Sequence, residues 1–415
     1  MQGSLYGLKI LHKSSAFSAS ILFILGEGAS KVAPFLLLPY FTNVKGASFY
    51  GEFALLQSIA VVLAVIIGFS QDGAISRFNF VYGKNSVGAL IFLAIINSLM
   101  ISICMFFLMC LFNARYISSV ILALSMFYSL LIFRYLQFNL MASRFFYLNV
   151  VSAILTVLFS FILINENVSD PKIFIYGLSL SHLLVSFISI VLIIYNDKLS
   201  LRRVIRKRYF SKVIFCYFLS IGFPTVIHQL GFVVRGHADR LIIDNFFSSE
   251  QLGVYVAAFQ LASVLSVVIV ALNKYFVVGF YSKLKNDGFD KDIFQKKIAY
   301  SFLFSILIYF IALNIPDEIY LLLGAEFISV AKFLPTFVLS VSLSIPYLMC
   351  ANLRFYFKQN YRIMMFSLGA TVIHLVFIYL FSRLSLTLVP WGGVISSLVL
   401  IFFIRVKNNE EFKKA

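Results

Sequence analysis

The sequence is poor in charged residues, which make up only 12% of its 415 positions, whereas 61% are hydrophobic. Acidic residues are the scarcer kind, with 17 against 34 lysines and arginines. A soluble domain cannot bury so much apolar surface, and the mean hydropathy of +0.95 is typical of a protein whose solvent is mostly lipid. Because the hydrophobic runs recur from end to end, they leave no room for a separate soluble domain.

Catalytic and nucleotide-binding motifs are absent from the sequence. It has no Gly-x-Ser-x-Gly elbow, no Walker loop and no His-Glu-x-x-His, and no paired carboxylates share a helix face. The four cysteines, Cys104, Cys110, Cys216 and Cys350, fall inside apolar runs, and we interpret them as small core residues. We therefore expect no enzymatic activity, no metal and no cofactor. Any energy coupling must then use ions or the substrate gradient.

The hydrophobic runs predict transmembrane helices. They are continuous and rich in Leu, Ile, Val and Phe, unlike the short alternating segments of a membrane barrel. Since one helical crossing needs roughly 20 apolar residues, we expect an all-α polytopic membrane protein of about twelve spans. The predicted spans are 16–41, 47–69, 87–112, 117–140, 146–165, 173–195, 213–235, 252–278, 298–315, 330–350, 361–381 and 386–404.

Basic residues are concentrated on one side of these spans. The termini and the even-numbered connections carry 24 lysines and arginines, against five in the odd-numbered connections. Basic connections stay in the cytoplasm, so we expect a multi-pass protein of the bacterial inner membrane with both termini cytoplasmic. This topology accounts for the net charge of +17 without a nucleic-acid partner, and anionic lipid headgroups are the expected contact.

A faint internal repeat divides the chain. The segment around Gly51, Tyr-Gly-Glu-Phe-Ala-Leu-Leu-Gln, has a counterpart around Gly253, 202 residues later. Six spans separate the copies, which predicts two parallel six-helix lobes. The expected lobes are 1–197 and 213–415, joined by a basic cytoplasmic connection at 198–212.

Several ionisable side chains lie inside the predicted spans, where each costs about 2.5 to 3.5 kcal/mol on translocon scales. Glu27 and Lys31 are four residues apart in the first span, in the favourable order for pairing. Either they form a neutral pair inside the bundle, or Lys31 faces a hydrated cavity and binds substrate phosphate while Glu27 tunes it. Arg134 and Lys274 either snorkel to headgroups or point inward and complete a cationic lining suited to a diphosphate.

The seventh predicted span ends in an unusually charged segment that contains Asp239 and Arg240. His228 lies in the same span and His374 in the eleventh. Because membrane histidines can relay protons, these four residues are candidates for ion coupling or gating. The alternatives are a solvated periplasmic helix end with ion pairs, and histidines that are simply hydrogen-bonded.

Short motifs in both halves resemble one protein family. The first half contains Leu-Leu-Pro-Tyr-Phe-Thr at 37–42, Phe-Tyr-Gly-Glu-Phe-Ala-Leu-Leu-Gln-Ser at 49–58, and Gly-Phe at 68–69. The second half contains Asp-Arg-Leu-Ile-Ile at 239–243 and Leu-Gly-Val-Tyr-Val-Ala-Ala at 252–258. These motifs resemble those of Wzx-type flippases of O-antigen and other polysaccharide repeat units. The resemblance covers essentially the whole chain.

The resemblance implies the multidrug, oligosaccharidyl-lipid and polysaccharide exporter superfamily. Its fold would be MATE-like, with two six-helix lobes around a central cavity that opens alternately to either side. The implied substrate is an undecaprenyl-diphosphate-linked oligosaccharide, the O-antigen repeat unit, flipped from the cytoplasmic to the periplasmic leaflet. Further implied partners are membrane lipids and the other assembly proteins of O-antigen and lipopolysaccharide biosynthesis.

Two other functions remain open. A cation-coupled multidrug exporter would have the same fold, but such exporters usually need acidic cavity residues, and only Glu27 is central here. A membrane O-antigen polymerase or ligase would be an enzyme of a different class. Those enzymes typically have a large periplasmic loop, whereas the outward connections predicted here are short.

Overall fold

A computed structural model of the chain describes residues 3–73, 75, 84–165, 169–197, 223–287, 289–357 and 359–405. Within these ranges the ordered elements are α-helices and short 3-10 helices (η), with no β-strand. The elements are α1 Gly3–Gly68, α3 Lys84–Phe112, η1 Ala114–Tyr116, α4 Ile117–Phe138, α5 Ala142–Asn165, α6 Pro171–Asp197, α9 Phe223–Asp244, α10 Ser249–Asp287, α11 Lys291–Leu313, η3 Asp317–Leu323, η4 Ala325–Lys332, α12 Leu334–Ser342, α13 Ser344–Tyr356, α14 Asn360–Ser382, η5 Leu386–Leu388 and α15 Val389–Ile404.

The described helices confirm the prediction of an all-α polytopic membrane protein. Ten helical stretches among these residues are long and apolar enough to cross a membrane, and each overlaps one of the predicted spans. Of the two remaining predicted spans, 16–41 falls in the N-terminal part of α1, where the apolar stretch Ile21–Ser30 is shorter. The other, 213–235, begins outside the described residues and continues into α9.

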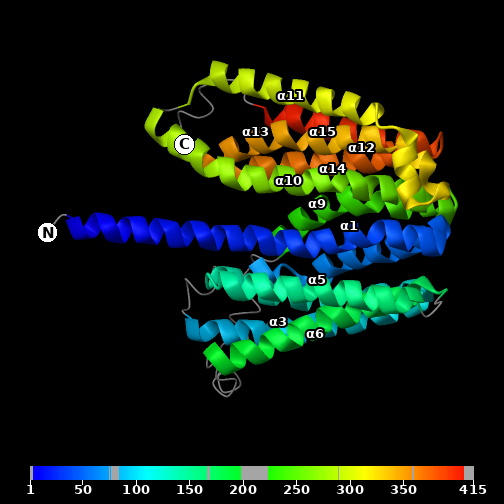
Figure 1. Ribbon diagram of the computed structural model, residues 1–415, viewed down its shortest axis with the longest axis horizontal. Helices are drawn as coiled ribbons and strands as arrows, with labels where there is room; N and C mark the ends of the chain where they lie inside the picture. The colour runs from blue at the N-terminus through cyan, green and yellow to red at the C-terminus, as the bar shows by residue number, and fades with distance from the viewer. Residues whose placement is uncertain are drawn as a thin grey trace. The chain divides into compact units, whose positions relative to one another are not determined.

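The chain forms two compact units. The first comprises Met1–Leu37 and Leu56–Leu230, and the second comprises Leu38–Leu55 and Gly231–Ala415. In the first unit α4 packs against α3, α5 and α6, and α5 also packs against α6 (Figure 1). In the second unit α15 packs against α12, α13 and α14, and α10 against α12 and α13.

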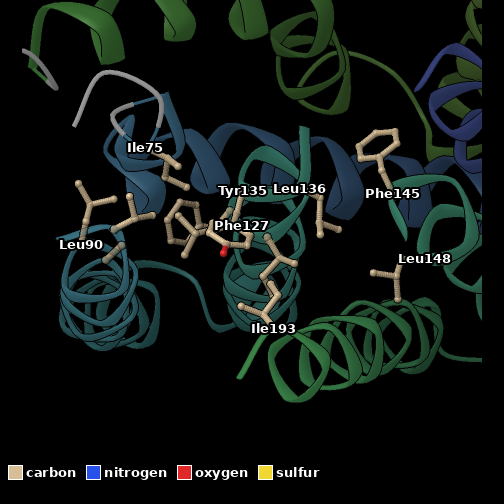
Figure 2. Packing of buried hydrophobic residues seen from close by; sticks show 12 residues of the cluster. Ile75, Leu90, Phe127, Tyr135, Leu136, Phe145, Leu148 and Ile193 are labelled. Carbon is tan, nitrogen blue, oxygen red and sulfur yellow. The ribbon is translucent and has the colours of Figure 1, made fainter. Parts of the chain in front are cut away.

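Aromatic and aliphatic side chains of α4 are central to the core of the first unit (Figure 2). Because lipid tails are as apolar as these side chains, close packing stabilises the bundle more than removal from water does. Polar contacts add to this packing: Ser129 of α4 donates to the carbonyl of His182 in α6 over 3.1 Å. The buried cluster consists of Ile75, Val87, Leu90, Ala94, Phe127, Leu131, Ile132, Tyr135, Leu136, Phe145, Leu148 and Ile193.

A single glycine separates the first two predicted spans. Helix α1 continues from Gly3 to Gly68 except at Gly46, whose φ of 78° and ψ of 175° are not helical. Few residues other than glycine adopt this backbone conformation without strain. The chain therefore turns between spans without a loop, and the segment Leu38–Leu55 around this break belongs to the second unit.

The two copies of the predicted repeat meet in the second unit. A Cβ atom added at Gly51 would lie 1.9 Å from the carbonyl oxygen of Ser249, and one added at Gly253 would lie 2.0 Å from that of Ala47. Each glycine thus faces the residue four positions before the other glycine. This reciprocal contact is what a local two-fold relation between α1 and α10 produces, and it requires glycine at both positions.

The tenth predicted span, 330–350, consists of two helices. Helix α12 ends at Ser342 and α13 begins at Ser344, with Leu343 between them at φ −62° and ψ −13°. Pro346 lies in the first turn of α13, where its missing N–H does least harm. Together the two helices form one apolar stretch from Leu334 to Tyr356.

Candidate functional site

A row of four polar side chains crosses three segments of the first unit. Nε of Arg134 lies 3.4 Å from Oδ2 of Asp72, and Nη1 of Arg134 donates to Oε1 of Gln137 over 3.1 Å. The amide of Gln137 then donates to Oε1 of Glu27 over 3.2 Å. The row thus joins two carboxylates, one guanidinium and one amide from α1, α4 and the turn after α1.

An unusual turn places Asp72 in this row. Phe69 and Ser70, which follow the end of α1, have positive φ angles of 45° and 55°. Such angles are strained for residues with side chains, and persist where the surrounding structure enforces them. The turn leaves Asp72 only 6% exposed, whereas 51% of the Arg134 side chain is exposed.

The row brings together two of the predicted cavity residues, Glu27 and Arg134. The guanidinium of Arg134 contacts protein groups, and its partners include a buried carboxylate. Placing three ionisable groups on one face against acyl chains would cost several kcal/mol. This face therefore favours water or the bundle interior over lipid. The side chains of the other predicted cavity residues, Lys31 in α1 and Lys274 in α10, lie outside the described part of the structure.

A second polar cluster lies at the C-terminal end of α9. Asp239 and Arg240 are 5% and 4% exposed, respectively. The Asp239 carboxylate accepts a hydrogen bond from the Tyr255 hydroxyl over 2.7 Å and another from the Arg240 backbone N–H over 2.9 Å. The Arg240 guanidinium lies 5.0 Å from the centre of the Phe259 ring, within range of a cation–π interaction.

The same guanidinium determines the state of His237. Nη1 of Arg240 lies 3.0 Å from Nδ1 of His237. Since arginine can only donate, Nδ1 must accept, and the imidazole is neutral with its proton on Nε2. The guanidinium of Arg240 thus contacts both the His237 imidazole and the face of the Phe259 ring.

Helix α14 completes the surroundings of this cluster. Arg235 of α9 donates to the Ser367 hydroxyl over 3.1 Å, and the Thr371 hydroxyl donates to the carbonyl of Gly231 over 2.9 Å. His374, also in α14, has its Nδ1 3.3 Å from the Ser396 hydroxyl of α15. Of the predicted coupling or gate residues, Asp239 and Arg240 therefore belong to this cluster, and His374 lies in α14, the helix that contacts α9 at Arg235 and Gly231.

The remaining candidate for coupling, His228, has a side chain outside the described residues. The alternative of a solvated helix end is wrong for Asp239 and Arg240, because both side chains are buried. The sequence analysis missed Asp72, Gln137 and Tyr255, which hold the charged residues in place. Gln137 was accessible to prediction, because it lies three residues from Arg134 on the same helix face.

More than half of the chain matches a single protein family. A family model described as polysaccharide biosynthesis protein matches residues 18–278, which is more than half of the chain. This chain belongs to the polysaccharide biosynthesis protein family. The matched region includes both polar clusters apart from the α14 and α15 side chains.

A similar relative in sequence is Lsg locus putative protein 1 of Haemophilus influenzae. It is 30% identical over 393 residues, covering 93% of this chain and 96% of the relative. Among solved structures, the lipid II flippase MurJ in an inward closed conformation has a TM-score of 0.69, with 14% identity and coverage of 98% of this chain and 89% of MurJ. An inward-facing multidrug resistance MATE family transporter of the MOP superfamily has a TM-score of 0.63, with 15% identity and coverage of 93% and 92%.

These similarities confirm the resemblance that the motifs indicated. The fold of this family member is MATE-like, as predicted, and the ten candidate spans among the described residues agree approximately with the prediction of about twelve. At the level that these findings support, the protein is a multi-pass membrane protein of the polysaccharide biosynthesis protein family.

Proposed function

We propose that this family member is a flippase for an undecaprenyl-diphosphate-linked oligosaccharide, the O-antigen repeat unit. It moves the head group from the cytoplasmic to the periplasmic leaflet of the bacterial inner membrane by alternating access. The lobes, residues 1–197 and 213–415, rock about the basic connection 198–212 and open a central cavity to one side and then the other. Both termini are cytoplasmic in this proposal, and the flippase performs no catalysis.

One observation carries the proposal: the family match coincides with cationic groups placed within membrane-spanning helices. Arg134 is the described example, since its half-exposed guanidinium is fixed by a carboxylate and an amide. Lys31 and Lys274 are proposed as further cavity cations. Guanidinium and ammonium groups bind phosphate oxygens by charge-assisted hydrogen bonds, which are about twice as strong as neutral ones. The polyprenyl tail stays in lipid throughout.

Replacement of the proposed cavity lysine tests this function. In a strain whose chromosomal copy is deleted, plasmid-borne Lys31→Ala is expected to reduce surface O-antigen without lowering the amount of protein. The physical reason is the loss of a positive charge that is proposed to bind the substrate's phosphate. Lys297→Ala, which removes an exposed lysine of α11, is the matched control and should restore normal surface polymer. Normal polymer in the Lys31→Ala strain would remove Lys31 from the mechanism.

The rival functions give different outcomes. A multidrug exporter would have the fold that this chain shares with the MATE neighbours, but at 15% identity the likeness concerns the fold alone. Expression of such an exporter in a drug-sensitive strain would raise resistance, which the proposed flippase does not. A polymerase or ligase would leave unpolymerised units at the outer face of a deletion strain, whereas loss of the flippase leaves them at the inner face.

A further inference from the structure

The ion pair between Arg134 and Asp72 is long and is made through a single nitrogen of the guanidinium. The 3.4 Å separation of Arg134 Nε and Asp72 Oδ2 is longer than the 2.7–2.9 Å that is typical of a charge-assisted hydrogen bond. This ion pair runs through Nε, and the contact with Gln137 runs through Nη1. Asp72 therefore engages the guanidinium at one point, without the two parallel bonds of a bidentate pair.

The two partners also differ in their freedom to move. Asp72 has a short side chain that is 7% exposed, and it lies two residues after Ser70 in the strained turn. Arg134 has a long side chain that is 51% exposed. A competing anion can therefore reach the guanidinium from outside, while Asp72 cannot follow it outward.

A diphosphate should bind the Arg134 guanidinium more strongly than the Asp72 carboxylate does. It carries more negative charge than a carboxylate and offers several oxygens to the planar fork of arginine. The amide of Gln137 bonds both Arg134 and Glu27, so the guanidinium stays oriented while one acceptor replaces another. Each exchange replaces one charge-assisted contact by another, so the guanidinium never lacks an anionic partner.

We propose that Asp72 is a positioning residue that holds Arg134 ready, and that the diphosphate of the substrate takes its place on the guanidinium. This inference rests on the proposed flippase function and adds a residue that controls affinity. When the head group leaves, Asp72 returns to Arg134 and opposes rebinding. The carboxylate thus weakens binding and promotes release.

Equilibrium binding with purified full-length protein tests the exchange. The protein is placed in nanodiscs of zwitterionic phosphatidylcholine, and the probes are undecaprenyl diphosphate and undecaprenol, which has the same tail without phosphate. Asp72→Asn keeps the size of the side chain and removes its charge, so the Kd for undecaprenyl diphosphate should fall roughly two- to fivefold. Arg134→Ala should raise it roughly tenfold or more. Undecaprenol should bind all variants alike.

A double-mutant cycle separates this mechanism from a structural role. In the Arg134→Ala background, Asp72→Asn should have no further effect on Kd, because the guanidinium for which Asp72 and the diphosphate compete is already gone. A merely structural Asp72 would give weaker binding when replaced, since a damaged site does not bind more tightly. Glu318→Gln removes an exposed carboxylate elsewhere and should keep the wild-type Kd.

The possible results lead to distinct conclusions. Equal or weaker binding of undecaprenyl diphosphate by Asp72→Asn overturns the exchange and leaves the flippase proposal standing. If Asp72→Asn does not fold, Arg134→Lys replaces it: loss of the planar fork should raise the Kd, and an unchanged Kd would overturn the inference. Wild-type protein that binds undecaprenyl diphosphate no better than undecaprenol would contradict both the exchange and the flippase.

Discussion

At the scale of single residues, we expect hydrogen bonds to buried charges to contribute to the stability of the fold. The Tyr255 hydroxyl donates to a carboxylate, Asp239, that is 5% exposed. Removal of that donor in Tyr255→Phe leaves the Asp239 oxygen short of a partner and should destabilise the protein by about 1–3 kcal/mol. A lower melting temperature in detergent would be the readout. Tyr300→Phe, at a tyrosine that is 68% exposed, should melt like the wild type; equal melting of both variants would contradict this role of Tyr255.

Whether a residue could be predicted depended on its sequence surroundings. Asp239 and Arg240 were found because charges are rare at the end of an apolar helix. Asp72 was missed because an acid in a connection is normally solvated, and only the backbone turn at Phe69 and Ser70 buries it. Tyr255 was missed because nothing in its local sequence marks it, whereas the spacing of Gln137 from Arg134 was a usable signal.

Two helices cross at the level of their backbones in the second unit. Because a Cβ at Gly253 would lie 2.0 Å from a carbonyl oxygen, Gly253→Ala must push α10 away from the segment around Ala47. We expect a clear fall in melting temperature and loss of complementation, and the same for Gly51→Ala. Gly279→Ala, also in α10 but with no heavy atom within 4 Å, should behave as the wild type. A stable and active Gly253→Ala would contradict the crossing.

The break at Gly46 is stabilised by a carboxylate from a distant segment. Oε2 of Glu326 in η4 accepts a hydrogen bond from the Ala47 N–H over 2.7 Å, where the helix after the break begins. A carboxylate is favourable at a helix N-terminus, because it caps an orphan donor and opposes the helix dipole. Nearby, the Asn43 side chain donates to the carbonyl of Leu322 over 2.8 Å.

Replacement of this carboxylate tests its role as a cap. Glu326→Ala should lower stability by about 1 kcal/mol, because the Ala47 N–H loses its acceptor. Thermal unfolding in detergent measures the effect, and Glu318→Ala, at an exposed position of η3, serves as the control. If the two variants have the same melting temperature, the hydrogen bond from Ala47 to Glu326 does not stabilise the fold.

At the scale of elements, the spans were predictable and their joints were not. Hydropathy located ten apolar stretches, because lipid imposes both the length and the composition of a crossing. Hydropathy could not predict that Gly46 alone separates two spans, or that Leu343 divides another. Both joints are set by backbone dihedral angles and by contacts with segments far away in the sequence.

For the whole molecule, contacts within the second unit join connections that the topology places on one side. Glu326 links the connection after the ninth span to that after the first, and both are odd-numbered. Arg354, in the connection after the tenth span, donates to the carbonyls of Ile404 and Arg405 near the C-terminus. The topology places even-numbered connections and the C-terminus on the same side. The repeat of Gly51 and Gly253 likewise predicted the parallel orientation of two helices that cross.

The predicted orientation in the membrane rests only on the distribution of basic residues. It therefore needs a test of its own. A reporter enzyme that is active only in the cytoplasm should be active when it is fused after Leu201, in the basic connection 198–212. A second fusion in the connection between α11 and α12 should report the opposite side. Periplasmic activity of the fusion after Leu201 would reverse the topology.

The leaflet that holds the lipid-linked unit is the most direct test of the proposed function. Sealed vesicles from a strain that lacks this protein are prepared right-side-out and inside-out, and a membrane-impermeant oxidant attacks exposed sugars. We expect that, without the protein, only inside-out vesicles lose the linked oligosaccharide, and that the plasmid-borne protein restores attack in right-side-out vesicles. Attack in right-side-out vesicles of the deletion strain would show that the unit crosses the membrane without this protein, and would contradict the proposed flippase function.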